Sequence, residues 1–448
     1  MIIQAPPSKS LSHRGLIAAA LTRGESVVSN VLQSDDIQRT RDCLTALGAD
    51  IAAEGSTCRV RGALPLSNGG SGDEPVSLNV GESGTTCRLI TPVAAALGRR
   101  CRIFGEGRMH ERPIGELSRA LEQLGVSFIW EGKAGYPPFI LEASGLSGGS
   151  AEISLEESSQ YLSGLLLAAP LAEAGVSLGI SGRKAVSWPY VGLTLQTMQA
   201  FGVEPRMEVR RGSGWQEVSW EEVHVLRPGE VRFHVEPARY APQSFWVEGD
   251  WSNASYFLAA GALLPQGLTV GGLGRHSVQG DRMMADILRT MGAAIDWERS
   301  GLSVRPGKLN GAELDMGFCP DIVPTVAVLA SLAEGSTRIT NVAHLRIKES
   351  DRLGGVAKEI EKAGAKTSVF EDGLEISPKQ RPLPDSLALC TYGDHRMAMS
   401  LSLFELAGCA VELDDSKCVA KSFPGFFQSW EAVRRLAKAA ESGPIGRA

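Results

Sequence analysis

Residues 346–352 (RIKESDR) place three cations and two carboxylates within seven positions. If this run begins a helix, Lys348 and Arg352 lie one turn apart on the same face, and Glu349 lies three positions before Arg352. A carboxylate held beside two positive charges can donate or accept a proton inside an anion-binding site. The same pattern is typical of an exposed, ion-paired helix start, so other motifs must decide between these interpretations.

Three more aspartates precede apolar stretches. Asp321 precedes the apolar segment 322–332 and is either a buried N-cap or a general base, and the sequence leaves both open. Asp394 places charge on the first turn of another apolar helix. Asp250 precedes an apolar helix that runs through 264, and there we favour a plain N-cap.

The N-terminal segment offers groups suited to binding an anion. Ser8 or Ser10 can cap a helix that continues into the Ala-rich stretch 15–21. Its free N–H groups, together with Lys9 and Arg14, would hold a carboxylate or phosphate. A capped helix with surface charges would have the same sequence. The spacing of a nucleotide-binding P-loop is absent.

Two further segments combine a turn or loop with groups that suit anions. Gly81 and Gly84 lie in a turn before the apolar segment 89–97, where missing side chains let backbone amides approach a ligand. Arg108 and Arg112 lie in a loop before a helix, and a guanidinium group grips carboxylate or phosphate through two parallel hydrogen bonds.

Hydroxyl groups precede two other helices. Ser158, Ser159 and Gln160 precede the apolar segment 162–169, and Ser187 opens a later helix. Ordinary capping and a phosphate seat both remain open for these residues.

One pattern recurs along the chain: an amphipathic helix, a glycine at its C-terminal end, and a small or apolar residue that opens a strand. The glycines lie roughly 70 to 90 residues apart and are Gly48, Gly125, Gly202, Gly292 and Gly364. A final helix over about 426–438 would be the sixth copy. Six units of a few strands and two helices predict two domains of three units each, with the active site between them.

Composition limits the class of protein. A chain of 448 residues is long enough for two domains, and a formal charge of −6 argues against general affinity for nucleic acid. The eight cysteines are scattered, without Cys-x-x-Cys pairs, and we interpret them as reduced thiols. No apolar run approaches the roughly 18 residues of a membrane span, and no signal peptide precedes the first strand. We therefore expect a cytoplasmic location.

Taken in order, these motifs resemble those of the 5-enolpyruvylshikimate-3-phosphate (EPSP) synthase family of enolpyruvyl transferases, the 3-phosphoshikimate 1-carboxyvinyltransferases. The resemblance runs nearly end to end, and its most specific motifs are 108–113 (RMHERP), 158–160 (SSQ), 346–352 and 394–399 (DHRMAM). It implies an α/β fold of two inside-out α/β barrel domains, each of three repeated βαβαββ-type units, with the active site in the interdomain cleft. Residues 9–248 would form the N-terminal domain, on the shikimate 3-phosphate side. Residues 1–8 plus 249–448 would form the C-terminal domain, with the catalytic carboxylates and phosphoenolpyruvate.

The reaction implied is transfer of the enolpyruvyl group of phosphoenolpyruvate to the 5-hydroxyl of shikimate 3-phosphate, with release of phosphate through a tetrahedral intermediate. Carried over residue by residue, the resemblance assigns shikimate 3-phosphate to Ser10, Arg14, Ser158, Ser159, Gln160, Ser187 and Tyr190. It assigns phosphoenolpyruvate to Lys9, Gly84, Arg112, Gln160, Arg352, Arg396 and Lys421.

Proton transfer would then involve four residues. Asp321, aided by Lys348, would take the proton of the hydroxyl, and Glu349 would protonate the methylene carbon, with Lys9 as the other candidate donor. The resemblance implies no metal or cofactor, a monomer, and neither nucleic acid nor membrane as partner.

Some positions depart from the family pattern. Glu82 stands where Asn is common, and we predict that it turns away or pairs with a neighbouring cation such as Arg88. Leu89 replaces a frequent Pro, and His344 a frequent Asn.

Three alternatives share the fold. The sister transferase that acts on UDP-N-acetylglucosamine usually has a reactive Cys where this chain has Gly107, and it lacks the Ser-Ser-Gln motif. A non-catalytic binding protein would need loss of Asp321, Glu349 or Lys9, and all three are present. RNA 3′-terminal phosphate cyclases also share the architecture, but the negative charge disfavours them.

Overall fold

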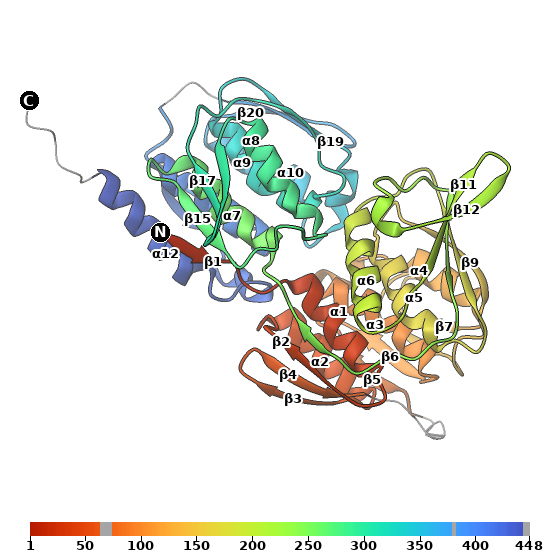
Figure 1. The fold of residues 1–448 in the computed structure, drawn as a ribbon. Helices are drawn as coiled ribbons and strands as arrows, with labels where there is room; N and C mark the ends of the chain where they lie inside the picture. Colours follow the sequence, from red (N-terminus) through yellow and green to blue (C-terminus); the bar gives the residue numbers. More distant parts are fainter. Residues whose placement is uncertain (63–73, 379–381, 442–448) are drawn as a thin grey trace, which may run out of the picture. The chain divides into compact units, whose positions relative to one another are not determined.

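The computed structural model describes residues 1–62, 74–378 and 382–441 (Figure 1). The chain divides into two compact units: unit 1 comprises Met1–Pro6 and Glu248–Ala448, and unit 2 comprises Pro7–Val247. Strand β1 (Ile2–Gln4), red in Figure 1, pairs in parallel with the green strand β15 (Leu268–Gly271). The first residues of the chain therefore belong to unit 1, although the chain enters unit 2 directly after them.

Unit 2 contains three mixed sheets with one repeated strand order. In the sheet β5-β6-β8-β7, the first two strands are parallel, and β8 is antiparallel to both of its neighbours. The sheet β14-β2-β4-β3 has the same order, and β9-β10-β13-β11-β12 adds one edge strand. The bounds are β2 Glu25–Ser29, β3 Asp50–Glu54, β4 Thr57–Arg61, β5 Val76–Asn79, β6 Cys101–Phe104, β7 Ser127–Trp130, β8 Phe139–Glu142, β9 Gly149–Ser154, β10 Val176–Ser181, β11 Arg206–Arg211, β12 Gly214–Val218, β13 Val231–Val235 and β14 Ser244–Trp246.

The helices of unit 2 alternate between almost fully buried and partly buried. Helices α1 (Lys9–Ala20), α3 (Gly84–Ala96) and α5 (Gln160–Ala168) are buried along nearly their whole length. Helices α2, α4 and α6 follow them in turn, with bounds Asp35–Ala46, Gly115–Glu122 and Trp188–Ala200. Gly164 lets α3 and α5 approach closely, because a Cβ there would collide with the backbone oxygen of Arg88.

Unit 1 repeats this arrangement with one shortened sheet. Its sheets are β1-β15-β17-β16, β18-β19-β21-β20 and β22-β23. The remaining strand bounds are β16 Ala294–Glu298, β17 Gly301–Arg305, β18 Glu313–Asp315, β19 Thr337–Thr340, β20 Lys366–Val369, β21 Leu374–Ser377, β22 Ser386–Leu389 and β23 Ala410–Leu413. The helices are α7 Trp251–Leu263, α8 Met284–Thr290, α9 Val323–Leu332, α10 Arg352–Lys362, α11 His395–Leu401 and α12 Phe426–Glu441. The strands of the described residues thus form six sheets, none of them closed into a barrel.

The predicted helix ends are confirmed. Each of the five recurring glycines has a positive φ, between 79° and 106°, which L residues with a side chain adopt only at a cost. They follow α2, α4, α6, α8 and α10. The repeat predicted from the sequence therefore corresponds to every second helix of the chain, from α2 to α10.

The final helix, α12, docks through aromatic rings. The ring of Phe257 on α7 lies 5.9 Å from that of Phe426 and 6.2 Å from that of Trp430, measured between centroids. Trp430 also donates a hydrogen bond of 2.7 Å to Glu405. None of the described helices is long and apolar enough to cross a membrane.

One local prediction is wrong. Lys348 and Arg352 do not share a helical face, because a short 3-10 helix, η6 (Ala343–Ile347), ends before Lys348, which is extended, and α10 begins only at Arg352. The Asp351 carboxylate accepts a 3.0 Å hydrogen bond from the Gly354 N–H and caps α10. An aspartate that caps in this way must itself be non-helical, so it stops the helix from starting earlier.

Candidate active site

Arg352 is the centre of a buried charge cluster in unit 1. Its side chain is 2% exposed, and it donates to three carboxylates: Glu349 at 2.6 Å, Asp321 at 3.0 Å and Asp394 at 2.8 Å. Arg396 donates to the other oxygen of Asp321 at 2.7 Å. Residues from three separate segments therefore meet around two guanidinium groups.

The local structure explains why Asp321 is available for these ion pairs. It lies in the 3-10 helix η5 (Pro320–Ile322), ahead of α9, and the N-cap positions of these two helices are Cys319 and Ile322. The capping interpretation left open by the sequence is therefore excluded. Asp394, in contrast, caps α11 by accepting from the N–H of Arg396 at 2.9 Å, and it also accepts from the Ser350 hydroxyl at 2.9 Å.

These neighbours shift the protonation of the cluster. Burial alone raises the pKa of Asp321, but the charges of Arg396, Arg352 and Lys348 outweigh burial and hold that pKa well below its usual range. Burial lowers the pKa of Arg352, and the carboxylates of Asp394, Glu349 and Asp321 raise it further than burial lowers it. Asp321 is therefore ionised and a weak base for as long as both guanidinium groups remain beside it.

Lys348 and Lys421 are two further cations of unit 1. Lys348 follows η6 and acts electrostatically on Asp321. Lys421 ends the 3-10 helix η8 (Lys417–Lys421), which packs against α11, the helix of Arg396. His344 is buried in η6.

In unit 2, Arg14 is buried on α1 without a carboxylate partner among the described residues. Its guanidinium donates to Thr194 Oγ1 at 2.7 Å, to the Ser10 carbonyl at 2.9 Å and to the Tyr190 carbonyl at 2.9 Å. Burial lowers its pKa to about 10, which leaves it charged at neutral pH. A buried cation that is hydrogen-bonded only to neutral groups creates a positive potential that favours an anion.

Arg112 lies across the start of α3. A Cβ at Gly84 would meet the Cζ of Arg112 at 2.5 Å, so a side chain there would displace this guanidinium group. Arg112 also donates to the backbone carbonyl of Glu82 at 3.1 Å. Ser83 caps α3, and its hydroxyl accepts from the N–H of Thr86 at 3.2 Å.

The side chain of Glu82 points towards Gly107. A Cβ at Gly107 would collide with the Glu82 carboxylate, so this carboxylate lies against the loop after β6. It does not pair with Arg88, which donates instead to Gln160 at 3.0 Å and to the Pro113 carbonyl at 3.2 Å. Arg88 is therefore not the cation that pairs with Glu82, because Gln160 and Pro113 engage it, and the prediction that Glu82 turns away or pairs with another neighbouring cation stays a prediction. Leu89, the next residue, is buried in α3.

The Ser-Ser-Gln motif lies at the start of α5. Ser158 accepts from the N–H of Gln160 at 3.2 Å, whereas the hydroxyl of Ser159 makes no capping hydrogen bond. The amide of Gln160 donates to Thr85 at 2.9 Å, which joins α5 to α3. Ser187 precedes α6 in a left-handed conformation, with φ of 58°, and its hydroxyl makes no capping bond either.

Lys9 is fixed at the first position of α1. It pairs with Asp36 of α2 at 3.1 Å, and their side chains are 13% and 6% exposed. Ser8 caps α1, so the choice left open between Ser8 and Ser10 is decided. The structure thus groups Asp321, Glu349, Arg352 and Arg396 by direct bonds in unit 1, and Arg14 with Ser10 and Tyr190 in unit 2.

Several partners escaped the sequence interpretation. Asp394 was noted only for its charge, and Arg88 and Asp36 received no binding role of their own. A signal existed for Asp394, since an Asp that precedes an apolar helix is a capping residue with a second oxygen to spare. No short-range signal relates Arg88 to Gln160, which lies 72 positions away.

The fold and these two groups of side chains define an α/β protein with a buried arginine among neutral groups and a second cluster in which arginines hold carboxylates. The family model of EPSP synthase (3-phosphoshikimate 1-carboxyvinyltransferase) matches residues 1–217 and 221–430, and the chain belongs to this family.

Relatives and solved structures agree with this assignment. The chain is 39% identical over 437 residues to a 3-phosphoshikimate 1-carboxyvinyltransferase of Shewanella amazonensis, covering 95% of this chain and 94% of that protein. It is 40% identical over 440 residues to that of Paraburkholderia phytofirmans, covering 96% of each. An EPSP synthase structure from Acinetobacter baumannii matches with a TM-score of 0.72 at 24% identity, over 97% of this chain and 95% of that one. The enolpyruvyl transferase NikO of Streptomyces tendae matches at 0.70 and 17% identity, over 97% and 94%, which shows a shared fold.

Proposed function

We propose that this chain transfers the enolpyruvyl group of phosphoenolpyruvate to the 5-hydroxyl of shikimate 3-phosphate, with Asp321 and Glu349 as the groups that move protons. The observation that carries the proposal is the shared hold of Arg352 on both carboxylates, at 3.0 and 2.6 Å, with Arg396 on the far oxygen of Asp321. An addition and an elimination with proton transfers require groups that accept and donate protons, which the two carboxylates supply. They also require cations that can turn from the carboxylates to the substrate, which the two arginines supply.

The proposal assigns the sugar phosphate to unit 2. Its phosphate would lie at the starts of α5 and α6. The hydroxyl groups of Ser159 and Ser187 at these helix starts make no capping hydrogen bond. Free backbone N–H groups at both helix starts favour the same charge. Arg14 supports this assignment as a buried cation with neutral partners, and it orders Ser10 and Tyr190 through their carbonyls. Ser158 and Gln160 complete the set at α5.

The cations proposed for phosphoenolpyruvate form two groups, one described within each unit. Arg112 and Gly84 form one surface in unit 2, with Lys9 at the start of α1. In unit 1, the cations are Arg352, Arg396 and Lys421. The two substrates together carry roughly five to six negative charges, at about −1.5 to −2 per phosphate. Seven cations, counting Arg14 and Lys348, match this charge.

The same binding step activates Asp321. An anion that takes up Arg352 and Arg396 removes the two charges that depress the pKa of Asp321, so its basicity rises as the substrate arrives. Asp321, with Lys348 beside it, then takes the proton of the 5-hydroxyl as the oxygen bonds to C2 of phosphoenolpyruvate. Glu349 protonates C3 to give a methyl group and a tetrahedral intermediate, with Lys9 as the other candidate donor.

Elimination completes the cycle. The C2–O bond to phosphate breaks, Glu349 takes back a proton from the methyl group, and the double bond re-forms. The proton held by Asp321 passes to the departing phosphate. These steps consume no oxidant and leave the enzyme as it started.

The finer architecture also remains part of this proposal. The repeated strand order within each unit supports inside-out barrels with three βαβαββ-type units each. A monomer in the cytoplasm, acting on small anions rather than nucleic acid, agrees with the net charge of −6 and with eight cysteines that form no disulfide.

The sister activity on UDP-N-acetylglucosamine is disfavoured by one contact. That activity usually has a reactive cysteine where this chain has Gly107, and here the Glu82 carboxylate occupies the space that a side chain at 107 would need.

Phosphate release tests the proposal directly. The protein is mixed with phosphoenolpyruvate and either shikimate 3-phosphate or UDP-N-acetylglucosamine, and we expect release only with shikimate 3-phosphate. Asp321→Asn should lower kcat at least 100-fold, whereas Asp286→Asn, an exposed aspartate paired with Arg289 on α8, should act as wild type. Release only with the nucleotide sugar, or none with either substrate, would overturn the proposal.

A further inference from the structure

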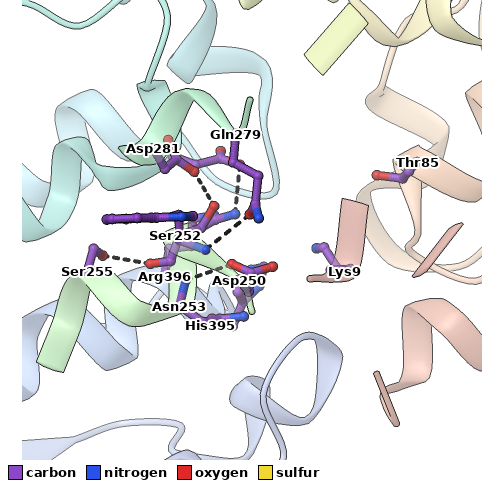
Figure 2. Close-up of polar contacts among 12 residues, drawn as sticks. Lys9, Thr85, Asp250, Ser252, Asn253, Ser255, Gln279, Asp281, His395 and Arg396 are labelled. Atoms are coloured by element: carbon purple, nitrogen blue, oxygen red, sulfur yellow. Dashed lines mark hydrogen bonds and ion pairs between the residues drawn. The ribbon is translucent and has the colours of Figure 1, made fainter. Parts of the chain in front are cut away.

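A second buried aspartate lies beside the charge cluster and has no part in the steps above. Asp281, in the 3-10 helix η4 (Gly280–Met283), is 2% exposed, and the hydroxyl of Ser252 donates to its carboxylate. Figure 2 shows the contact between Asp281 and Ser252, which lies at the start of α7. Burying a carboxyl group costs free energy unless it is hydrogen-bonded or paired with a charge.

The fold fixes Asp281 in place through its neighbour Gln279. The amide oxygen of Gln279 accepts from the N–H of Trp251 at 3.1 Å, and its amide nitrogen donates to the Gly249 carbonyl at 2.8 Å and to Glu248 at 2.7 Å. The 3-10 helix η4 also packs against η5, which carries Asp321. Asp281 is therefore bonded to the first turn of α7 through Ser252, and it lies close enough to Asp321 and Arg396 for their charges to act on it.

Four ionisable groups surround Asp281: the carboxylates of Asp321 and Asp250, the guanidinium of Arg396 and the thiol of Cys319. Burial raises the pKa of Asp281 first and the charge of Asp321 raises it further, whereas Arg396 and the Ser252 hydroxyl lower it. The net result is a pKa of about 7. Asp281 therefore exists in both its neutral and its ionised form near neutral pH.

We propose that Asp281 is a positioning residue that controls how much of the charge of Arg396 is available to Asp321 and to the substrate. When Asp281 is neutral, the positive charge of Arg396 acts on Asp321 and on the anion that binds beside it. Ionised Asp281 is a second buried carboxylate that competes for the same guanidinium. This inference rests on the proposed role of Arg396 in holding phosphoenolpyruvate.

The effect on catalysis has a definite direction. As pH rises through 7, Asp281 loses its proton and draws on the charge of Arg396, so the KM for phosphoenolpyruvate rises. kcat changes little, because Asp321 and Glu349 keep their places. In Asp281→Asn, position 281 is neutral at every pH, and the rise should disappear.

The test compares KM for phosphoenolpyruvate and kcat from pH 6 to 8.5 in wild type, Asp281→Asn, Ser252→Ala and the control Asp286→Asn. We expect at least a threefold rise of KM in wild type and in the control, and less than a 1.5-fold change in Asp281→Asn. Ser252→Ala removes a donor that stabilises the ionised form, so the midpoint of the rise should move to higher pH. A rise in Asp281→Asn equal to that of wild type would overturn the proposal.

Thermal unfolding provides a readout that needs no activity. A carboxyl group whose pKa is raised by folding stabilises the protein at low pH and loses that contribution as pH rises from about 4 to about 7. The Tm of wild type should therefore fall relative to that of Asp281→Asn across this window and then stay level. If no variant releases phosphate, the proposed function is wrong, and parallel Tm curves would separately refute the titration of Asp281.

Discussion

Arg352 is buried among three carboxylates that come from different parts of the chain, and its position is a compromise. Taking a guanidinium group and its partners out of water costs several kcal/mol per ion, and only good geometry and further hydrogen bonds offset this cost. Asp394 supplies both, because it binds Arg352 and caps α11 at once. The cluster is therefore stable only when complete.

Asp394→Asn tests this dependence. The substitution keeps the shape but removes the charge beside Arg352, and we expect a loss of about 3 kcal/mol in the free energy of unfolding. Urea denaturation measures this loss. The exposed Asp286→Asn should change stability by no more than about 0.5 kcal/mol. Equal effects of the two substitutions would show that the buried cluster contributes no more than a surface pair.

Glu82 allows a second prediction at this scale. Its carboxylate lies against Gly107, and its backbone carbonyl accepts a hydrogen bond from Arg112. Glu82→Asn should therefore change the KM for phosphoenolpyruvate by less than tenfold. Gly107→Ala should raise this KM, because the added methyl group displaces the carboxylate towards Arg112. A KM more than tenfold lower in Glu82→Asn would show that Glu82 repels the substrate.

The residue roles show where sequence reasoning stops. The types and order of the motif residues predicted that Asp321, Glu349 and Arg396 belong to one site. They did not contain the hold of Asp394 on Arg352, which joins positions 42 apart, or the place of Asp281 beside Arg396. Such contacts depend on which helix starts come together, and no local pattern encodes that.

At the scale of elements, the recurring glycines were predictable because their requirement is local. A helix that ends in the left-handed conformation strongly favours glycine, and this leaves a mark in the sequence. The start of α10 was predicted wrongly for the opposite reason. Glu349, Ser350 and Asp351 are all compatible with a helix, and only the bonds that they make to Arg352, Asp394 and Gly354 keep them out of it.

Three glycines allow the cost of a left-handed backbone to be measured apart from the cost of a steric clash at Cβ. At Gly292, φ is 106° and a Cβ would collide with the Lys308 carbonyl; at Gly55, φ is 57° and no atom lies within 4 Å; at Gly132, neither cost applies. We expect Gly292→Ala to lose about 2 to 3 kcal/mol, Gly55→Ala about 1 kcal/mol and Gly132→Ala about 0.5 kcal/mol or less, measured by urea denaturation. Equal losses at Gly292 and Gly55 would mean that the collision is relieved by relaxation.

At the scale of the whole molecule, unit 2 is one continuous segment, whereas unit 1 is assembled from both sides of it. The strand β1 supplies the edge of the sheet β1-β15-β17-β16, and β14 occupies the corresponding edge in unit 2. Each unit thus completes one of its sheets with a strand that lies next to a crossing of the chain.

Deletion of residues 1–4 tests this arrangement. Without β1, the N–H and C=O groups of β15 lose their parallel partner at Thr269 and Val270. Hydrogen exchange should become faster in β15 and remain unchanged in β2, whose partners β14 and β4 belong to unit 2. Faster exchange in both strands would show that the two units are not independent in stability.

The edge position of β1 also has a consequence for synthesis on the ribosome. Gln4 leaves the ribosome 264 positions ahead of Leu268, so β1 waits for β15 while all of unit 2 is made. At about 5–20 residues per second, this wait lasts roughly 10 to 50 s. Unit 2 has time to fold on the growing chain, whereas the nascent start of unit 1 is an unpaired strand that has to be kept from pairing elsewhere.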